Sequence, residues 1–151
     1  ELLEFARYGI NYYGTPKAYV QQQLDLGKNV ILEIEIQGAL KIKKQFPDTI
    51  LLFVTAPDAK TLRDRLVGRG TETQDVINAR LARACEESEG IENYDYLVVN
   101  DTVAHGGELI HEPVGDERSG NTAQNAAYRV SSNIDFINNM KEELVSFSKG
   151  E

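Results

Sequence analysis

The sequence predicts an α/β fold built around a parallel β-sheet. Three short apolar runs that favour strands alternate along the chain with segments that favour helices. One of these runs, "TILLFVTAP" at residues 49–57, is almost continuously apolar, which is typical of a strand buried on both faces of a parallel sheet. Strands separated by helices indicate parallel pairing, and ligands of such sheets bind at the carboxyl ends of the strands.

The first half of this pattern contains recognisable helix boundaries. A helix is predicted from Pro16 to the region of Gly27, because proline is favoured in the first turn and glycine ends helices. The strand "NVILEIEI" at residues 29–36 follows, and a helix over residues 37–46 ends before a proline. After the apolar run, Asp58 is expected to cap a helix that continues to residue 69.

In the second half of the chain, the alternation of helix and strand patterns continues to residue 101 and then stops. A helix is predicted over residues 73–90, followed by the strand "YDYLVVND" at residues 94–101. Residues 102–127 contain scattered Gly, Pro, Asn and Ser without a sustained period, so this segment is predicted to be an irregular and mobile loop. A C-terminal helix within residues 128–151 is indicated by apolar residues at helical spacing. These residues are Ile134, Ile137, Met140 and Leu144.

Composition restricts the functional classes. A chain of 151 residues suits one ordinary globular domain. The net charge of −8 argues against a general nucleic-acid binder, which needs a basic surface. No apolar run is long enough for a membrane span and the first residues do not resemble a secretory leader, so we expect a cytoplasmic protein that does not contact a membrane. The single cysteine, Cys85, excludes an internal disulfide and is interpreted as a small buried residue.

Two acidic residues lie on the predicted strand at residues 29–36. Glu33 and Glu35 are two residues apart and would project from the same face of a strand. Carboxylates near the ligand-binding edge of a sheet suit a hydrated Mg²⁺ ion or the hydrogen-bond donors of a purine. The alternative interpretation is the exposed face of an edge strand.

Basic residues are concentrated between residues 60 and 83, a segment that contains six Lys or Arg residues and three acidic residues. Arg65 and Arg69 are four residues apart on one helical face, and glycines flank Arg69. Guanidinium groups bind phosphate oxygens in a forked geometry, so the cluster is consistent with a phosphate-binding lid. A solvated charged face is the alternative. His105 and His111 have no matching third ligand, so no metal site is assigned.

Taken together, the motifs resemble bacterial-type guanylate kinases. The stretches "EFARYGINYYGT", "ILEIEIQGA", "RLVGRGTET…INARL" and "YDYLVVND" follow the order and approximate spacing of that family over residues 1–101, with a family-like tail from Tyr128. The resemblance implies a P-loop nucleoside-monophosphate-kinase-like, three-layer parallel sheet. It also implies four segments: a remnant of the GMP-binding domain (1–27), a core (28–101) with a lid at about 65–83, the irregular segment (102–127) and the C-terminal helix (128–151).

For GMP, the resemblance implies four binding residues. Glu4 corresponds to the carboxylate that accepts hydrogen bonds from guanine. Tyr13 and Thr15 correspond to the phenol and hydroxyl that hold GMP, whereas Tyr12 is expected to pack. Glu33 corresponds to an acidic residue linked to GMP and to water around the metal.

For phosphoryl transfer, the resemblance implies catalytic arginines and an ATP-binding region. Arg65, Arg69 and Arg80 correspond to arginines that contact the transferring phosphates. Asn100 corresponds to a residue near the adenine of ATP, and Glu35 to the second acid, which acts with ATP and Mg²⁺. The implied reaction is ATP-dependent phosphorylation of GMP to GDP, a step of purine metabolism in which positioning and charge neutralisation dominate.

The sequence departs from the family pattern in one respect. It contains no glycine-rich P-loop ending in Gly-Lys-Ser/Thr, the motif that holds the donor phosphates. We therefore expect a form truncated at the N-terminus, marginally stable or self-associated, with little phosphotransfer by itself. The alternatives are a catalytically weak, guanylate-kinase-like module that binds phosphopeptides and a structural protein that reuses the sheet. Retention of the arginines favours the first interpretation.

Overall fold

The computed structural model describes residues 1–8, 11–68 and 73–149 of the chain. It divides into two compact units, Glu1–Thr49 and Ile50–Glu151. This boundary differs from the predicted ones after residues 27 and 101, because residues 30–42 pack against the N-terminal hairpin and form one core with it.

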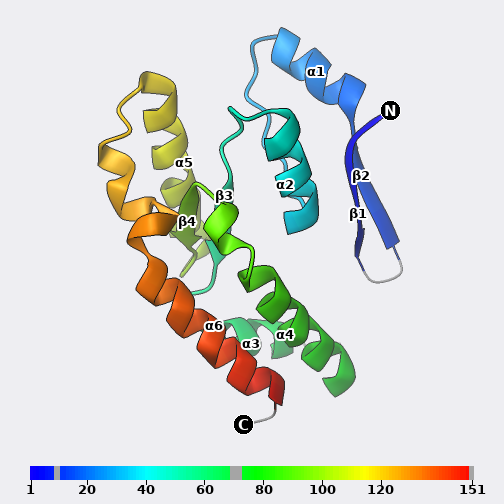
Figure 1. Cartoon of the computed structure of the whole chain (residues 1–151), viewed down its shortest axis with the longest axis vertical. Helices are drawn as coiled ribbons and strands as arrows, with labels where there is room; N and C mark the ends of the chain where they lie inside the picture. The colour runs from blue at the N-terminus through cyan, green and yellow to red at the C-terminus, as the bar shows by residue number, and fades with distance from the viewer. Residues whose placement is uncertain (9–10, 69–72, 150–151) are drawn as a thin grey trace. The chain divides into compact units, whose positions relative to one another are not determined.

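The N-terminal unit consists of an antiparallel hairpin and two helices. Its elements are β1 (Leu2–Tyr8), β2 (Asn11–Pro16), α1 (Lys17–Asp25) and α2 (Ile36–Gln45). Helix α2 lies beside β1 (Figure 1). The buried residues that hold the unit together are Leu3, Val20 and Ile42.

The predicted boundaries of α1 are confirmed. Pro16 stands immediately before the helix with a φ of −65°, the angle that a proline ring imposes. Gly27 follows the helix with a φ of +72°, a conformation that side-chain-bearing residues rarely adopt. The backbone N–H of Gly27 donates to the carbonyl of Leu24 at 2.8 Å, which ends the last turn.

The predicted strand over residues 29–36 is wrong. Residues 28–35 form a connection without strand pairing, and α2 begins at Ile36. A strand needs backbone hydrogen bonds to a neighbour, and both ladders among the described residues, β1 with β2 and β3 with β4, exclude this segment. The alternation of the sequence is nevertheless retained, because Ile31 and Glu33 are exposed. The residues between and beside them pack on the core: Val30, Leu32 and Ile34.

The C-terminal unit contains a parallel strand pair surrounded by helices. Its strands are β3 (Leu52–Thr55) and β4 (Tyr96–Val99). Its α-helices are α3 (Ala59–Val67), α4 (Gln74–Ser88), α5 (Val103–Ser119) and α6 (Ile134–Lys149). Short 3₁₀ turns cover Ile91–Asn93, Gln124–Tyr128 and Val130–Ser132.

The parallel pairing predicted for the two strands is confirmed. Leu52 lies opposite Tyr96, and the register continues to Thr55 opposite Val99. The expectation that β3 is buried on both faces is wrong for the chain as described, because Val54 is 48% exposed. A strand of this kind is covered on both faces only when elements pack on each side, so an apolar run alone does not establish double burial.

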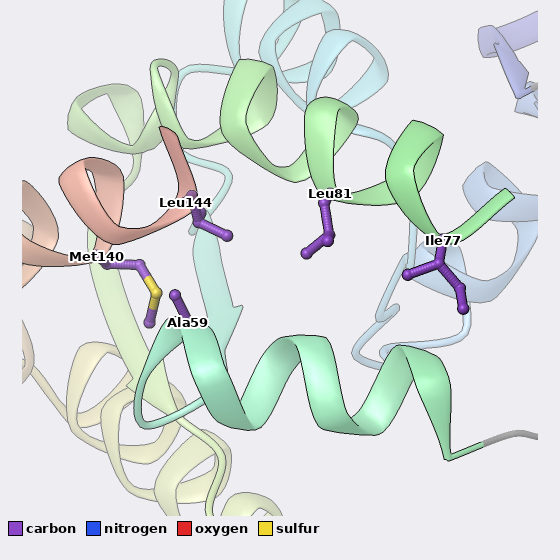
Figure 2. Packing of buried hydrophobic residues seen from close by; sticks show 5 residues of the cluster. All are labelled: Ala59, Ile77, Leu81, Met140 and Leu144. Carbon is purple, nitrogen blue, oxygen red and sulfur yellow. The ribbon is translucent and has the colours of Figure 1, made fainter. Parts of the chain in front are cut away.

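Helices α3, α4 and α6 enclose a hydrophobic cluster (Figure 2), which we call the three-helix cluster. Its buried members are Ala59, Ile77, Leu81, Met140 and Leu144. Two carboxylates accept hydrogen bonds from backbone N–H groups at the start of α3. Asp58 accepts from the backbone N–H of Thr61 at 2.5 Å, as predicted, and Glu143 of α6 accepts from the N–H of Ala59 at 3.3 Å. The bond to Thr61 lowers the pKa of Asp58 from its usual value.

The prediction of an irregular segment at residues 102–127 is wrong. Helix α5 occupies most of it, followed by a 3₁₀ turn. Glycines and Pro113 weaken the helix signal in the sequence, but tertiary contacts stabilise the helix. Pro113 is fully buried and its carbonyl accepts from Asn125 Nδ2 at 3.1 Å, while Gly106 is buried against Asn100.

Candidate functional site

A buried carboxylate lies inside the N-terminal unit. Glu4 is only 5% exposed, and its Oε1 atom accepts a hydrogen bond of 2.7 Å from the Thr15 hydroxyl. The two residues are opposite one another in the β1–β2 pair, so the bond crosses the hairpin. The structure therefore brings together two of the residues predicted to bind GMP, with Thr15 orienting the carboxylate of Glu4.

The other carboxylate oxygen lies against Gly38 in the first turn of α2. A Cβ atom built on Gly38 would lie 2.5 Å from Glu4 Oε2 and 3.2 Å from Cδ. No Cβ contact as short as 2.5 Å is sterically acceptable, so only glycine leaves room for this carboxylate position. No pattern in the sequence marked Gly38 as a functional residue. Its place three residues after Glu35, the second acid of the Glu33–Glu35 pair, was the only available signal.

The remaining GMP candidates lie at the surface of the same unit. Tyr13 is 58% exposed. Tyr12 is 70% exposed, so the expectation that it packs is wrong: the hairpin leaves this ring largely in solvent. Glu33 is exposed on the connection at residues 28–35, and Glu35 is half-buried at the N-cap position of α2, without a side-chain capping bond.

In the C-terminal unit, Arg65 reaches the carboxyl end of β4. Its Nη1 donates to the carbonyl of Asn100 at 2.8 Å and its Nη2 to the carbonyl of Asp101 at 2.7 Å. These two bonds use two of the five N–H donors of a guanidinium group. Two further site candidates, Arg65 and Asn100, are thus in contact, at the edge where ligands of parallel sheets bind.

An open pocket of about 280 Å³ lies beside this contact, within the C-terminal unit. Arg65 and Asn100 contribute polar groups, and the rest of the lining is mainly apolar. The apolar side chains include Phe53, Leu62, Met140 and Leu144. Asn100 Oδ1 is buried and has no hydrogen-bond partner in the described part of the chain, so this amide retains an unused acceptor.

Of the other two arginines predicted to contact phosphate, the structure describes only Arg80. Arg80 is half-buried on α4. Arg69 lies outside the described residues, as do the neighbouring positions 70–72 of the predicted lid. Within residues 1–8, 11–68 and 73–149, no group of three or more His, Cys, Asp or Glu side chains is arranged to hold a metal ion. None of the helices in these ranges has the length and apolar character needed to cross a bilayer.

The parallel strand pair, its helices and the hairpin unit define an α/β protein of the P-loop nucleoside-monophosphate-kinase-like class. A sequence profile of the guanylate kinase family matches residues 1–114, and the chain belongs to this family. The predicted resemblance is confirmed and extends beyond residue 101, into α5.

Individual relatives agree with the profile. Guanylate kinase of Halalkalibacterium halodurans is 54% identical over 103 residues, which are 68% of this chain and 50% of the relative. Guanylate kinase of Lactococcus lactis is 50% identical over 117 residues, 78% of this chain and 57% of the relative. Guanylate kinase of Streptococcus thermophilus is 49% identical over 117 residues, which are 78% of this chain and 56% of the relative. The chain spans about half the length of the curated relatives that it matches.

Proposed function

We propose that the whole protein transfers the γ-phosphoryl group of ATP to GMP, and that the N-terminal unit of this chain recognises guanine through Glu4. The observation that carries the proposal is the buried carboxylate held by Thr15 at 2.7 Å. Guanine presents N–H donors that a carboxylate accepts, whereas adenine lacks the same donor pattern. A buried acceptor that is oriented before ligand binding discriminates strongly between such bases.

The arginines supply charge stabilisation in this proposal. A phosphate oxygen of GMP attacks the γ-phosphorus of ATP, and the bond from that phosphorus to the bridging oxygen breaks to leave ADP. GMP already carries a nucleophilic oxygen, so the protein mainly positions the groups and neutralises charge. Arg65, Arg69 and Arg80 are the proposed contacts to the phosphates. Arg65 has three N–H donors beyond its two bonds to carbonyls, so it can contact a phosphate without leaving β4.

The carboxylates and the remaining polar groups complete the assignment. Glu33 is exposed and Glu35 is half-buried, and carboxylate oxygens are suitable ligands for Mg²⁺ and its bound waters. We assign these two residues to the metal and its waters, with Glu33 also near GMP. Mg²⁺ would neutralise phosphate charge when bound. Tyr13 is assigned to the GMP phosphate and Asn100 to the adenine of ATP.

Nucleotide binding tests the guanine assignment. The chain should bind GMP more tightly than AMP, and Glu4→Gln should reduce that preference by about 1–3 kcal/mol because it replaces a charged acceptor. Isothermal titration calorimetry of both nucleotides measures the difference. Glu108→Gln, at an exposed position of α5, is the matched control and should leave the preference unchanged.

Two results would contradict this assignment. One is equal affinity of the unmodified chain for GMP and AMP. The other is an unchanged preference in the Glu4→Gln variant. Binding of a phosphopeptide without any discrimination between nucleotides would instead support the interaction-module alternative.

A further inference from the structure

We propose that Gly38 is a positioning residue that sets the carboxylate of Glu4 and thereby the selectivity of the site for guanine. The inference rests on the proposed function, because it assumes that Glu4 recognises guanine. It adds a residue of α2 to the contact between Glu4 and Thr15, which the hairpin forms, and it concerns only the N-terminal unit.

Glycine is required at position 38 for a steric reason and not for its backbone conformation. Gly38 is absent from the described glycines with positive φ, which are Gly27 and Gly120, so its backbone conformation is open to other residues. Within a helix, glycine is less favourable than alanine by about 1 kcal/mol. The contact with Glu4 explains why a poor helix former occupies a buried helical position.

Neighbouring contacts limit any rearrangement that could accommodate a methyl group. Leu3, adjacent to Glu4 on β1, and Ile42 of α2 belong to the same buried cluster, which sets the separation of strand and helix. On the other side, Thr15 holds Glu4 Oε1 at 2.7 Å. A side chain at position 38 would therefore displace the carboxylate and break its bond to Thr15.

The N-terminal turn of α2 also attracts a carboxylate. Backbone N–H groups at the start of a helix carry partial positive charge. The first turn contains no acidic residue, and Glu35 makes no side-chain capping bond. The absence of a side chain on Gly38 lets the carboxylate of Glu4 approach this turn closely.

A size-compensation experiment tests the inference. Gly38→Ala should reduce the GMP preference over AMP by about tenfold, because the contact requires the carboxylate to move. It should also lower the melting temperature, although alanine is the better helix former. Adding Glu4→Asp shortens the acidic side chain by one methylene and should restore the melting temperature. Gly115→Ala on α5, where a Cβ meets nothing within 4 Å, is the control and should change neither quantity unfavourably.

The outcomes separate this inference from the proposed function. Retention of the full GMP preference and melting temperature in Gly38→Ala would overturn the role of Gly38, as would a failure of Glu4→Asp to compensate. If Gly38→Ala alone does not fold, recovery of a folded chain in the double variant supports the contact. Equal binding of GMP and AMP by the unmodified chain would contradict the proposed function, and the compensation in melting temperature then still decides whether Gly38 positions Glu4.

Discussion

Leu81→Ala is expected to lower the free energy of unfolding by about 2–5 kcal/mol, the range for removing a large buried aliphatic side chain. Leu81 is 2% exposed and lies in the three-helix cluster of α3, α4 and α6 (Figure 2). The substitution removes apolar contacts and leaves a cavity that the surrounding helices fill only in part. Chemical unfolding followed by far-UV circular dichroism measures the change.

Val76→Ala on the same helix provides the control. Val76 is exposed, and alanine is a better helix former than valine, so the free energy of unfolding should change by no more than about 0.5 kcal/mol. If both substitutions lowered the free energy of unfolding equally, the claim that α4 stabilises the protein mainly through the three-helix cluster would be contradicted.

Tyr96→Phe is expected to lower the free energy of unfolding by about 1–3 kcal/mol, because it leaves buried polar groups without a partner. The Tyr96 side chain is fully buried, and its hydroxyl donates to the Glu117 carboxylate and accepts from Asn125 Nδ2 at 3.3 Å. Arg129 lies over the Tyr96 ring at 5.4 Å, so residues of β4, α5 and the following segment meet at this tyrosine. Chemical unfolding at neutral pH measures the loss.

Tyr128→Phe is the matched control, because its hydroxyl bond to Glu112 is exposed and contributes little to stability. The pH dependence offers a second measurement. Burial raises the pKa of Tyr96 above its usual value, and the bond to Glu117 adds to the increase. The resulting stability is fully present below the unfolded pKa of about 10 and is lost at higher pH. Tyr96→Phe should therefore make the alkaline loss of stability shallower, and an unchanged slope would contradict the buried network.

Much of the fold could be predicted because its determinants are local. Pro16 and Gly27 delimit α1, and Asp58 begins α3, since ring geometry, positive φ and side-chain capping act within a few residues. The motifs also predicted the family and drew attention to Glu4 with Thr15 and to Arg65 with Asn100. Both pairs are in contact in the structure, the second through the backbone of Asn100.

The predictions that failed concern residues whose partners are distant in the sequence. Residues 28–35 have the alternation of a strand, but pairing requires a neighbouring backbone that no local pattern supplies. Glycine and proline lower the helix propensity of α5, yet the buried contact of Pro113 with Asn125 stabilises it. The sequence by itself thus determined the family, most helix boundaries and the candidate residues. Only the tertiary structure decided strand pairing, the helical state of α5 and the close approach of Gly38 to Glu4, because packing between separated segments outweighs local propensity.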